Sequence, residues 1–88
     1  MVPVLRLLGG LRRFGGRTQS VPGDTVTAVL AASAIPPALL FPDGQLNHDI
    51  EVLVNGRNIT FLAGLETPLS ANDRVTIFLH GARGYPGG

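Results

Sequence analysis

The chain contains no cysteine and no tryptophan among its 88 residues. Without thiols it can form no disulfide, no thiolate metal site and no cysteine-based active site. Its two histidines, His48 and His80, stand alone, without the spacing of a metal site or of an acid–base pair. We therefore assign them no role, expect no bound metal or cofactor, and do not expect the chain to be an enzyme.

Lysine is also absent, because all seven basic residues are arginine. The N-terminus is the one amine that the chain carries. No side chain of this protein can therefore accept an isopeptide bond, whatever the origin of the bias in composition.

Charge of either sign is sparse, at 15% of residues, and the net charge is +1. Such a balance gives no field that would attract nucleic acid or an anionic membrane. No apolar run approaches the roughly 18 residues of a membrane span, and the apolar start of the chain is interrupted by Arg6. With 44% hydrophobic residues the chain is apolar enough to fold as one globular domain, which we expect in the cytoplasm.

Short apolar segments and turn signals predict a first hairpin and one helix. Residues 2–8 are rich in apolar and β-branched side chains, and residues 17–21 follow a glycine pair as a second strand. Asp24 and Thr25 are both good helix N-caps, and apolar residues then recur at helical spacing. We expect a helix of about ten residues that Pro36-Pro37 ends, followed by a loop whose apolar residues 38–41 fold back as a lid.

The second half of the chain predicts three more strands. Residues 50–54, the dipeptide Asn55-Gly56 and residues 57–60 form a strand, a type I′ turn and a returning strand. A helical turn around Thr67-Pro68 leads to a final, largely buried strand over residues 74–79. This order predicts an α+β fold, a mixed sheet wrapped around one main helix, with the first and last strands parallel.

Residues 81–88 have almost no side chains with which to build a core, so we expect a domain over residues 1–80 and a flexible tail over residues 81–88. The tail ends in Gly87-Gly88. Because glycine lacks Cβ, this pair could pass through a tunnel too narrow for any other residue. The carboxylate of Gly88 could thereby enter the active site of another protein.

The sequence resembles the ubiquitin-like sulfur carriers of the β-grasp fold, the MoaD/ThiS family, and most of all the small subunit of molybdopterin synthase. The matching segments are Leu11-Arg12, Gly23-Asp-Thr-Val26, Val54-Asn-Gly56, Leu65-Glu-Thr-Pro-Leu69, Asn72-Asp-Arg-Val75, Ile77-Phe78 and Gly87-Gly88. No single segment is specific, but their order spans nearly the whole chain.

The resemblance implies that a MoeB-like activating enzyme uses ATP to adenylate Gly88, and that sulfur then displaces AMP to give a thiocarboxylate. A larger, MoaE-like synthase subunit, or another acceptor, would receive the sulfur, most naturally in molybdopterin synthesis. By the same resemblance Phe78 helps to dock the activating enzyme and Gly87 lies with Gly88 in its cleft. Catalytic groups and ATP contacts would belong to the partners.

The tail departs from that family pattern, because residues 79–88 follow Phe78 where the synthase subunit is shorter and carries Pro-Pro. Ten extended residues reach about 33–36 Å. Arg83 resembles the basic tail of ubiquitin and is a candidate for partner binding. Two alternatives therefore stay open: a ubiquitin-like modifier joined through Gly88 to lysines of other proteins, and a β-grasp binding module whose tail is inert.

Three further features have both a functional and a structural interpretation. Arg12-Arg13 and Arg17 form either a docking patch for an acidic partner or a solvated turn. The pairs Gly9-Gly10 and Gly15-Gly16 lack the spacing and the Lys-Ser/Thr of a phosphate loop, and we interpret them as turn glycines. Phe78 itself could equally be an ordinary core residue of the last strand.

Overall fold

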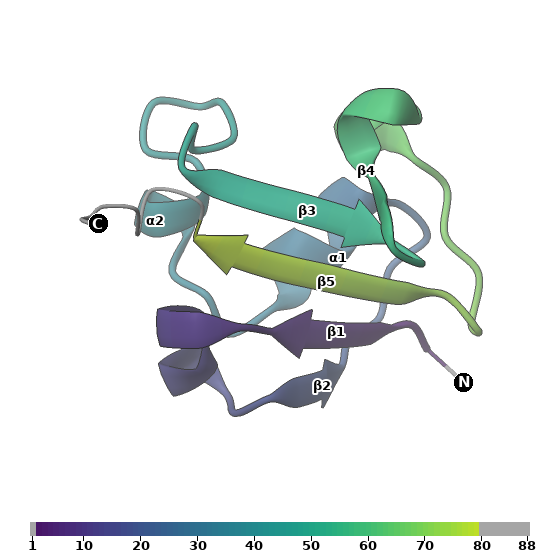
Figure 1. Ribbon diagram of the computed structural model, residues 1–88, viewed down its shortest axis with the longest axis horizontal. Helices are drawn as coiled ribbons and strands as arrows, with labels where there is room; N and C mark the ends of the chain where they lie inside the picture. Colours follow the sequence, from purple (N-terminus) through teal and green to yellow (C-terminus); the bar gives the residue numbers. More distant parts are fainter. Residues whose placement is uncertain (1, 80–88) are drawn as a thin grey trace.

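The computed structural model describes residues 2–79, which form one five-stranded mixed sheet with its main helix on one face (Figure 1). The elements in chain order are β1 (Val4–Leu7), the 3₁₀ helix η1 (Gly9–Phe14), β2 (Thr18–Ser20), α1 (Val26–Ala32), α2 (Pro37–Leu40), β3 (Ile50–Val54), β4 (Arg57–Asn58), the 3₁₀ turns η2 (Ile59–Phe61) and η3 (Gly64–Glu66), and β5 (Arg74–Leu79). The predicted α+β architecture is confirmed.

The strands lie in the order β2-β1-β5-β3-β4, so the last strand is central. β5 runs parallel to β1, with Leu7 opposite Ile77, and antiparallel to β3, with Ile50 opposite Leu79. The predicted parallel pairing of the first and last strands is therefore confirmed. β1 and β5 end at the same edge of the sheet, where Leu79 is the last described residue.

The hydrophobic core lies between the sheet and α1. Alternate residues of the strands face it, among them Leu5, Leu7, Val75 and Ile77, each fully buried. From α1 it receives Val26, Val29 and Leu30. The other face of the sheet, which is turned toward the viewer in Figure 1, has no helix over it.

The predicted start of α1 is confirmed, but its predicted end is wrong. Thr25 caps the helix, since its Oγ1 accepts the Ala28 N–H at 3.1 Å. The helix ends at Ser33, whose hydroxyl donates to the Leu30 carbonyl at 2.7 Å, before Pro36 is reached. Such a side-chain bond to a backbone carbonyl competes with the helical pattern.

Residues 37–40 form α2 where we expected a loop. Pro37 occupies the first turn, where the missing N–H breaks no helical bond. Leu40 is buried, and Leu39 and Phe41 pack against the core, so the apolar patch covers the core as a short helix.

The Asn55-Gly56 hairpin is confirmed, with φ of 52° and 86° at the two residues, as a type I′ turn requires. Its second strand is shorter than predicted. Asn58 accepts the Thr60 N–H at 2.9 Å and turns the chain into η2.

No helix of the described residues is long and apolar enough to cross a bilayer.

Candidate functional site

The predicted site residues Gly88, Gly87 and Arg83 lie outside the described residues, whereas Phe78 lies inside them. The structure therefore describes the surface around Leu79, after which residues 80–88 follow in the sequence. That surface is the shared end of β1 and β5, together with η1.

This end of the sheet is held by both neighbours of β5. The Leu8 N–H donates to the Ile77 carbonyl at 3.1 Å, which extends the parallel pairing past the end of β1. On the other side, the antiparallel register with β3 continues to Leu79. The last residues of β5 are thus bound on both sides, which fixes the position of Leu79, the last described residue.

Phe78 lies on the outer face of the sheet, away from the core. It stands between Ile77, which is buried in the core, and Leu79, which is partly buried against the core, and it is itself half-buried. Successive side chains of a strand point to opposite faces, so Phe78 points away from the core. It belongs neither to the core cluster nor to the partly buried hydrophobic residues packed against that cluster. Ordinary core packing therefore does not explain this aromatic side chain, which favours its interpretation as a contact for a partner.

A shallow groove of about 420 Å³ adjoins Phe78. It is lined by Leu8, Gly9, Gly10, Phe78 and Leu79. The sequence suggested only turn glycines at positions 9 and 10, so this groove was missed. No local signal could have revealed it, since its walls come from the two ends of the chain.

The groove is apolar and contains no acid, base or nucleophile among its described walls. Within residues 2–79 there is also no group of three or more His, Asp or Glu side chains that could hold a metal ion. The groove can accept an apolar side chain of another molecule but offers no catalytic chemistry of its own. It is a candidate docking site beside the point where residues 80–88 begin.

Comparison with known proteins agrees with this architecture. The family model described as the ThiS family matches residues 5–81. Over 39 residues the chain is 44% identical to a candidate sulfur carrier protein of Archaeoglobus fulgidus. That match covers 44% of each protein, so it spans less than half of the relative's length.

Solved structures match most of the chain. The small archaeal modifier protein 1 of Methanosarcina acetivorans is 28% identical, with a TM-score of 0.79 over 88% of this chain and 90% of that one. CysO of Mycobacterium tuberculosis is 29% identical, with a TM-score of 0.75 over 88% and 97% of the two chains. A chain of the BexX/CysO complex of Amycolatopsis orientalis is 25% identical, with a TM-score of 0.78 over 89% and 94%.

These neighbours confirm the predicted ubiquitin-like β-grasp fold. The family model covers the sheet, the helix and the groove, and the predicted family is likewise confirmed. The chain belongs to the ThiS family of ubiquitin-like sulfur carriers and small modifiers.

Proposed function

We propose that this protein is a sulfur carrier that is activated at the carboxylate of Gly88. The observation that carries the proposal is the match of the ThiS family model to residues 5–81, followed in the sequence by Gly87-Gly88. The position of Phe78 supports it, because this aromatic side chain lies outside the core at the end from which the diglycine segment continues.

The proposed chemistry has two steps. A carboxylate is a poor electrophile, so the Gly88 carboxylate first attacks the α-phosphorus of ATP, forms a mixed anhydride with AMP and releases pyrophosphate. A hydrosulfide-level sulfur then attacks the acyl carbon, the bond to AMP breaks, and Gly88 becomes a thiocarboxylate. This product is a better nucleophile than the carboxylate and can deliver its sulfur to an acceptor.

The described residues supply docking, and the partners supply catalysis. An activating enzyme of the MoeB kind binds ATP, contacts Phe78, and receives Gly87 and Gly88 in its cleft, with Arg83 as a further contact. We propose a pterin precursor on a MoaE-like synthase subunit as the acceptor, in molybdopterin synthesis. The BexX/CysO complex supports heteromeric assembly, since a chain of this fold was solved there in a complex.

A second candidate function is protein modification. The small archaeal modifier protein 1 of Methanosarcina acetivorans matches 88% of this chain, and residues 79–88 form a longer segment after Phe78 than the synthase subunit carries. Here the lysine amine of a target would attack the acyl carbon of the adenylated Gly88, and the isopeptide would form as the bond to AMP breaks and AMP and a proton are released. Because this chain has no lysine, it could not form polymers linked through its own side chains.

Intact-mass analysis of the C-terminal peptide distinguishes these functions. The protein is isolated from its native cells under non-reducing, non-hydrolysing conditions. Replacement of one oxygen of Gly88 by sulfur is expected for the carrier, and branched peptides joined to lysine are expected for the modifier. A plain carboxylate, even after supply of ATP, sulfur donor and the cognate activating enzyme, would contradict both and indicate an inert tail.

The variant Gly88→Ala tests the same point. A methyl group on the terminal residue should obstruct the narrow activating cleft and abolish adenylation, measured as ATP-dependent exchange of pyrophosphate. Gly81→Ala, which adds the same methyl group at the other end of residues 81–88, is the matched control and should remain active. Normal exchange in Gly88→Ala would contradict the proposal.

A further inference from the structure

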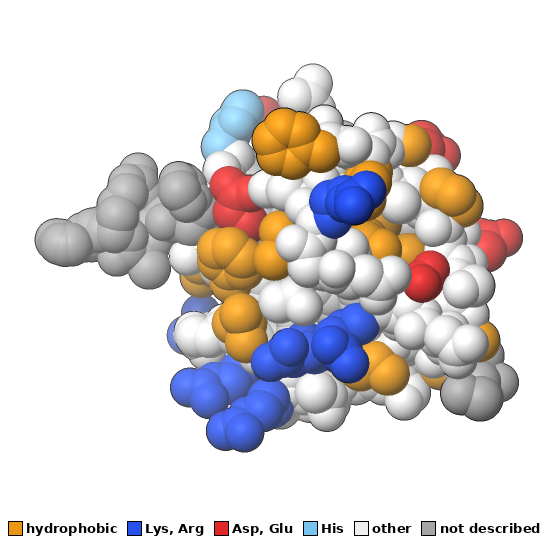
Figure 2. Space-filling view, turned by 45° about the vertical axis from the view of Figure 1, so that its right-hand side comes forward, with side chains coloured by type: hydrophobic (Ala, Val, Ile, Leu, Met, Phe, Trp, Pro, Cys, Tyr) orange, Lys and Arg blue, Asp and Glu red, His pale blue; other side chains and the backbone are white. Residues whose placement is uncertain are grey.

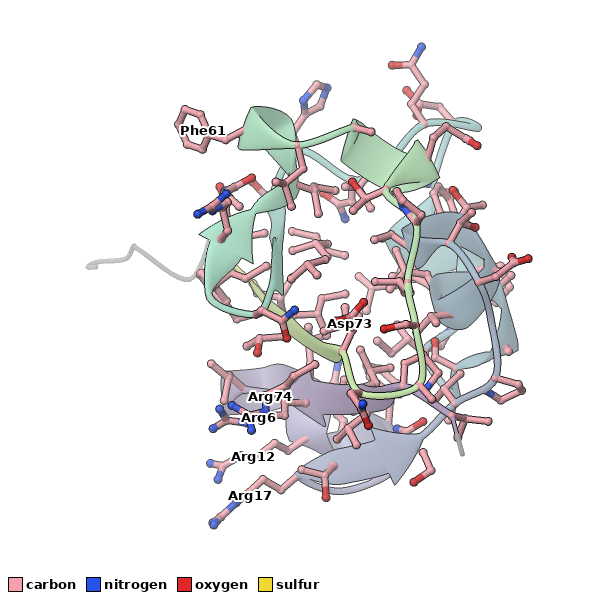
Figure 3. The ribbon with its side chains drawn as sticks, turned by 90° about the vertical axis from the view of Figure 1, so that its right-hand side faces the viewer. Arg6, Arg12, Arg17, Phe61, Asp73 and Arg74 are labelled. Carbon is pink, nitrogen blue, oxygen red and sulfur yellow. The ribbon has the colours of Figure 1, made fainter. Side chains whose placement is uncertain are left out.

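Four arginines from four parts of the chain gather on the outer face of the sheet. Arg6 lies on β1, Arg74 begins β5, Arg17 precedes β2, and Arg12 lies in η1. Their side chains point to the same side of the molecule, as Figure 3 shows. We refer to Arg6, Arg12, Arg17 and Arg74 as the arginine cluster.

The pairing of the strands brings this cluster together. Arg6 lies opposite both Thr18 and Thr76, in the middle of β1. The carbonyl of Arg17 accepts the Leu7 N–H at 2.8 Å, which places β2 beside β1. The sequence allowed two interpretations of Arg12-Arg13 and Arg17, a docking patch or a solvated turn. In the structure the cluster is not confined to that turn, because it extends across β1 to the start of β5.

Within residues 2–79 the arginine cluster forms no ion pair with a carboxylate, and Glu51, which lies opposite Phe78 on the same face, accepts the side-chain N–H of Asn58. Arg12 Nε donates instead to a backbone carbonyl, that of Gly9, at 3.3 Å. The carboxylate next to Arg74 in sequence, Asp73, instead accepts the Ser70 N–H at 2.8 Å and Asn55 Nδ2 at 3.0 Å. Like charges gathered in this way repel one another, so the positive charge of the cluster does not itself stabilise the fold.

Figure 2 shows basic side chains gathered in the lower part of one face, while a further basic group lies higher on that face among the acidic side chains. The net charge of the whole chain is only +1, so this separation is local. It gives the β1–β5 side of the sheet a positive potential while the protein as a whole is nearly neutral.

The arginine cluster adjoins the groove beside Phe78. Leu8, which lines the groove, follows Arg6 by two residues and so continues the same face of the strand. Arg12 folds back onto Gly9, another wall of the groove, through its hydrogen bond. Apolar walls and unneutralised guanidinium groups therefore form one continuous surface.

Gly10 lines this groove, although the fold does not require glycine at this position. A Cβ at Gly10 would meet nothing within 4 Å, and its φ is not positive. Neither crowding nor backbone conformation inside the chain accounts for the missing side chain. The missing side chain leaves this wall of the groove open to solvent.

We propose that the groove and the arginine cluster form one docking surface for a protein segment that carries an apolar side chain flanked by carboxylates. The apolar side chain fills the groove between Gly10 and Phe78, and the carboxylates pair with the guanidinium forks of the cluster. Arginine and aromatic residues are the types enriched in protein interfaces, and guanidinium groups match carboxylates with two parallel hydrogen bonds. The inference is independent of the chemistry of Gly88.

A protein segment fits this surface better than a nucleic acid does. The groove is lined by aliphatic and aromatic groups and glycine, and it offers no polar side chain to read a base or a sugar. A net charge of +1 also lacks the basic excess typical of nucleic-acid binders. In a protein segment of this kind the apolar side chain fills the groove and the carboxylates pair with the arginine cluster.

Titration of the full-length, ¹⁵N-labelled protein by NMR tests this proposal. The probe is a synthetic peptide with a central leucine flanked on both sides by glutamates, and its control carries glutamines at those positions. We expect amide shifts confined to β1, η1, the residues just before β2, and β5. The variant Arg6→Glu/Arg12→Glu should weaken peptide binding by about tenfold or more, because it replaces attraction by repulsion.

Matched variants keep the test specific. Arg57→Glu changes the same type of charge on β4, two strands away from β5, and should alter the affinity by less than about twofold. Arg12→Gln/Arg17→Gln removes charge without reversing it and should weaken binding even if the glutamate variant is poorly folded. Gly10→Val should weaken binding by filling the groove while thermal stability is unchanged.

Three results would overturn the proposal. Equal affinity for the glutamine peptide would show that the carboxylates do not contribute to binding. Absence of localised shifts at low ionic strength would remove the surface itself. Displacement of the peptide by a single-stranded RNA that binds more tightly would assign the cluster to a different class of partner.

Discussion

Gly23 shows how one position can constrain the approach of a loop to a helix. Its φ is 154°, and a Cβ placed there would lie 2.7 Å from the Val29 backbone nitrogen and 2.9 Å from Val29 Cγ2. Backbone atoms of α1 cannot move aside as a flexible side chain can. The glycine is therefore required by packing as well as by conformation.

We predict that Gly23→Ala lowers the free energy of unfolding by about 1–3 kcal/mol, because the helix and the loop must separate to admit the methyl group. Urea unfolding followed by circular dichroism measures the change. Gly10→Ala is the control, since a Cβ there meets nothing within 4 Å, and its stability should change by less than about 0.5 kcal/mol. Equal effects of the two variants would contradict the packing argument.

Asp73 organises the turn before β5 through its ionised carboxylate. The hydrogen bond from the Ser70 backbone N–H, and after it the bond from the Asn55 side chain, lowers the pKa of Asp73 below its ordinary value of 3.8. Asn55 in turn accepts the Arg74 N–H at 3.0 Å, so the turn is tied to the hairpin.

We predict that Asp73→Asn removes a part of the stability that depends on pH. Because the pKa of Asp73 is lower in the folded protein, its contribution is fully present above pH 3.8 and is lost as the pH falls through the folded-state pKa. The variant should melt below the wild type at neutral pH, and the difference should shrink in acid. Melting curves across pH check this, with Asp43→Asn as the control, and a difference independent of pH would contradict it.

Helix α1 depends on the cap that begins it and on contacts with the segment before β5. Thr25 Oγ1 caps the first turn, and the Val26 N–H donates to the Thr67 carbonyl at 3.1 Å. The hydroxyl of Thr27 donates to the Leu65 carbonyl at 2.9 Å. With seven residues, α1 is too short to be stable alone, so these bonds matter more than helix propensity.

We predict that Thr25→Ala lowers the free energy of unfolding by about 1 kcal/mol, since it leaves the Ala28 N–H without its cap. Thr25→Ser retains the hydroxyl and should recover most of that loss. Chemical denaturation of both variants measures the difference. A serine variant as unstable as the alanine variant would show that the methyl group, and not the cap, is what Thr25 contributes.

For the whole molecule, the described core and the proposed activation site lie in different parts of the sequence. All members of the core cluster lie between Leu5 and Ile77, whereas Gly88 lies beyond the described residues. The predicted boundary between a domain over residues 1–80 and a tail over residues 81–88 has not been tested and stays a prediction.

We predict that a chain ending at residue 80 unfolds at the same urea concentration as the full chain but is not adenylated. The physical reason is that the deletion removes none of the core residues found within residues 2–79. Ile77→Ala is the contrasting variant, because it empties a fully buried site of the central strand and should cost about 2–5 kcal/mol. A large loss of stability in the shortened chain would show that residues 81–88 belong to the folded domain.

Local sequence determined those elements whose cause lies within a few residues. Asn55-Gly56 determined the hairpin because both residues tolerate positive φ, and Thr25 determined the start of α1 through its own hydroxyl. The apolar pattern of residues 74–79 predicted the last, largely buried strand. The diglycine and the order of motifs likewise predicted the family. These features needed no knowledge of distant contacts.

Tertiary structure alone decided which face each strand buries and which distant residues meet. Alternation cannot say whether Phe78 faces the core or solvent, because a shift of register by one residue exchanges the two faces. The parallel pairing of β1 with β5 places Val4 opposite Arg74 and creates both the groove and the arginine cluster from the two ends of the chain. Contacts over such a sequence separation depend on the packing of the whole domain, which no local pattern encodes.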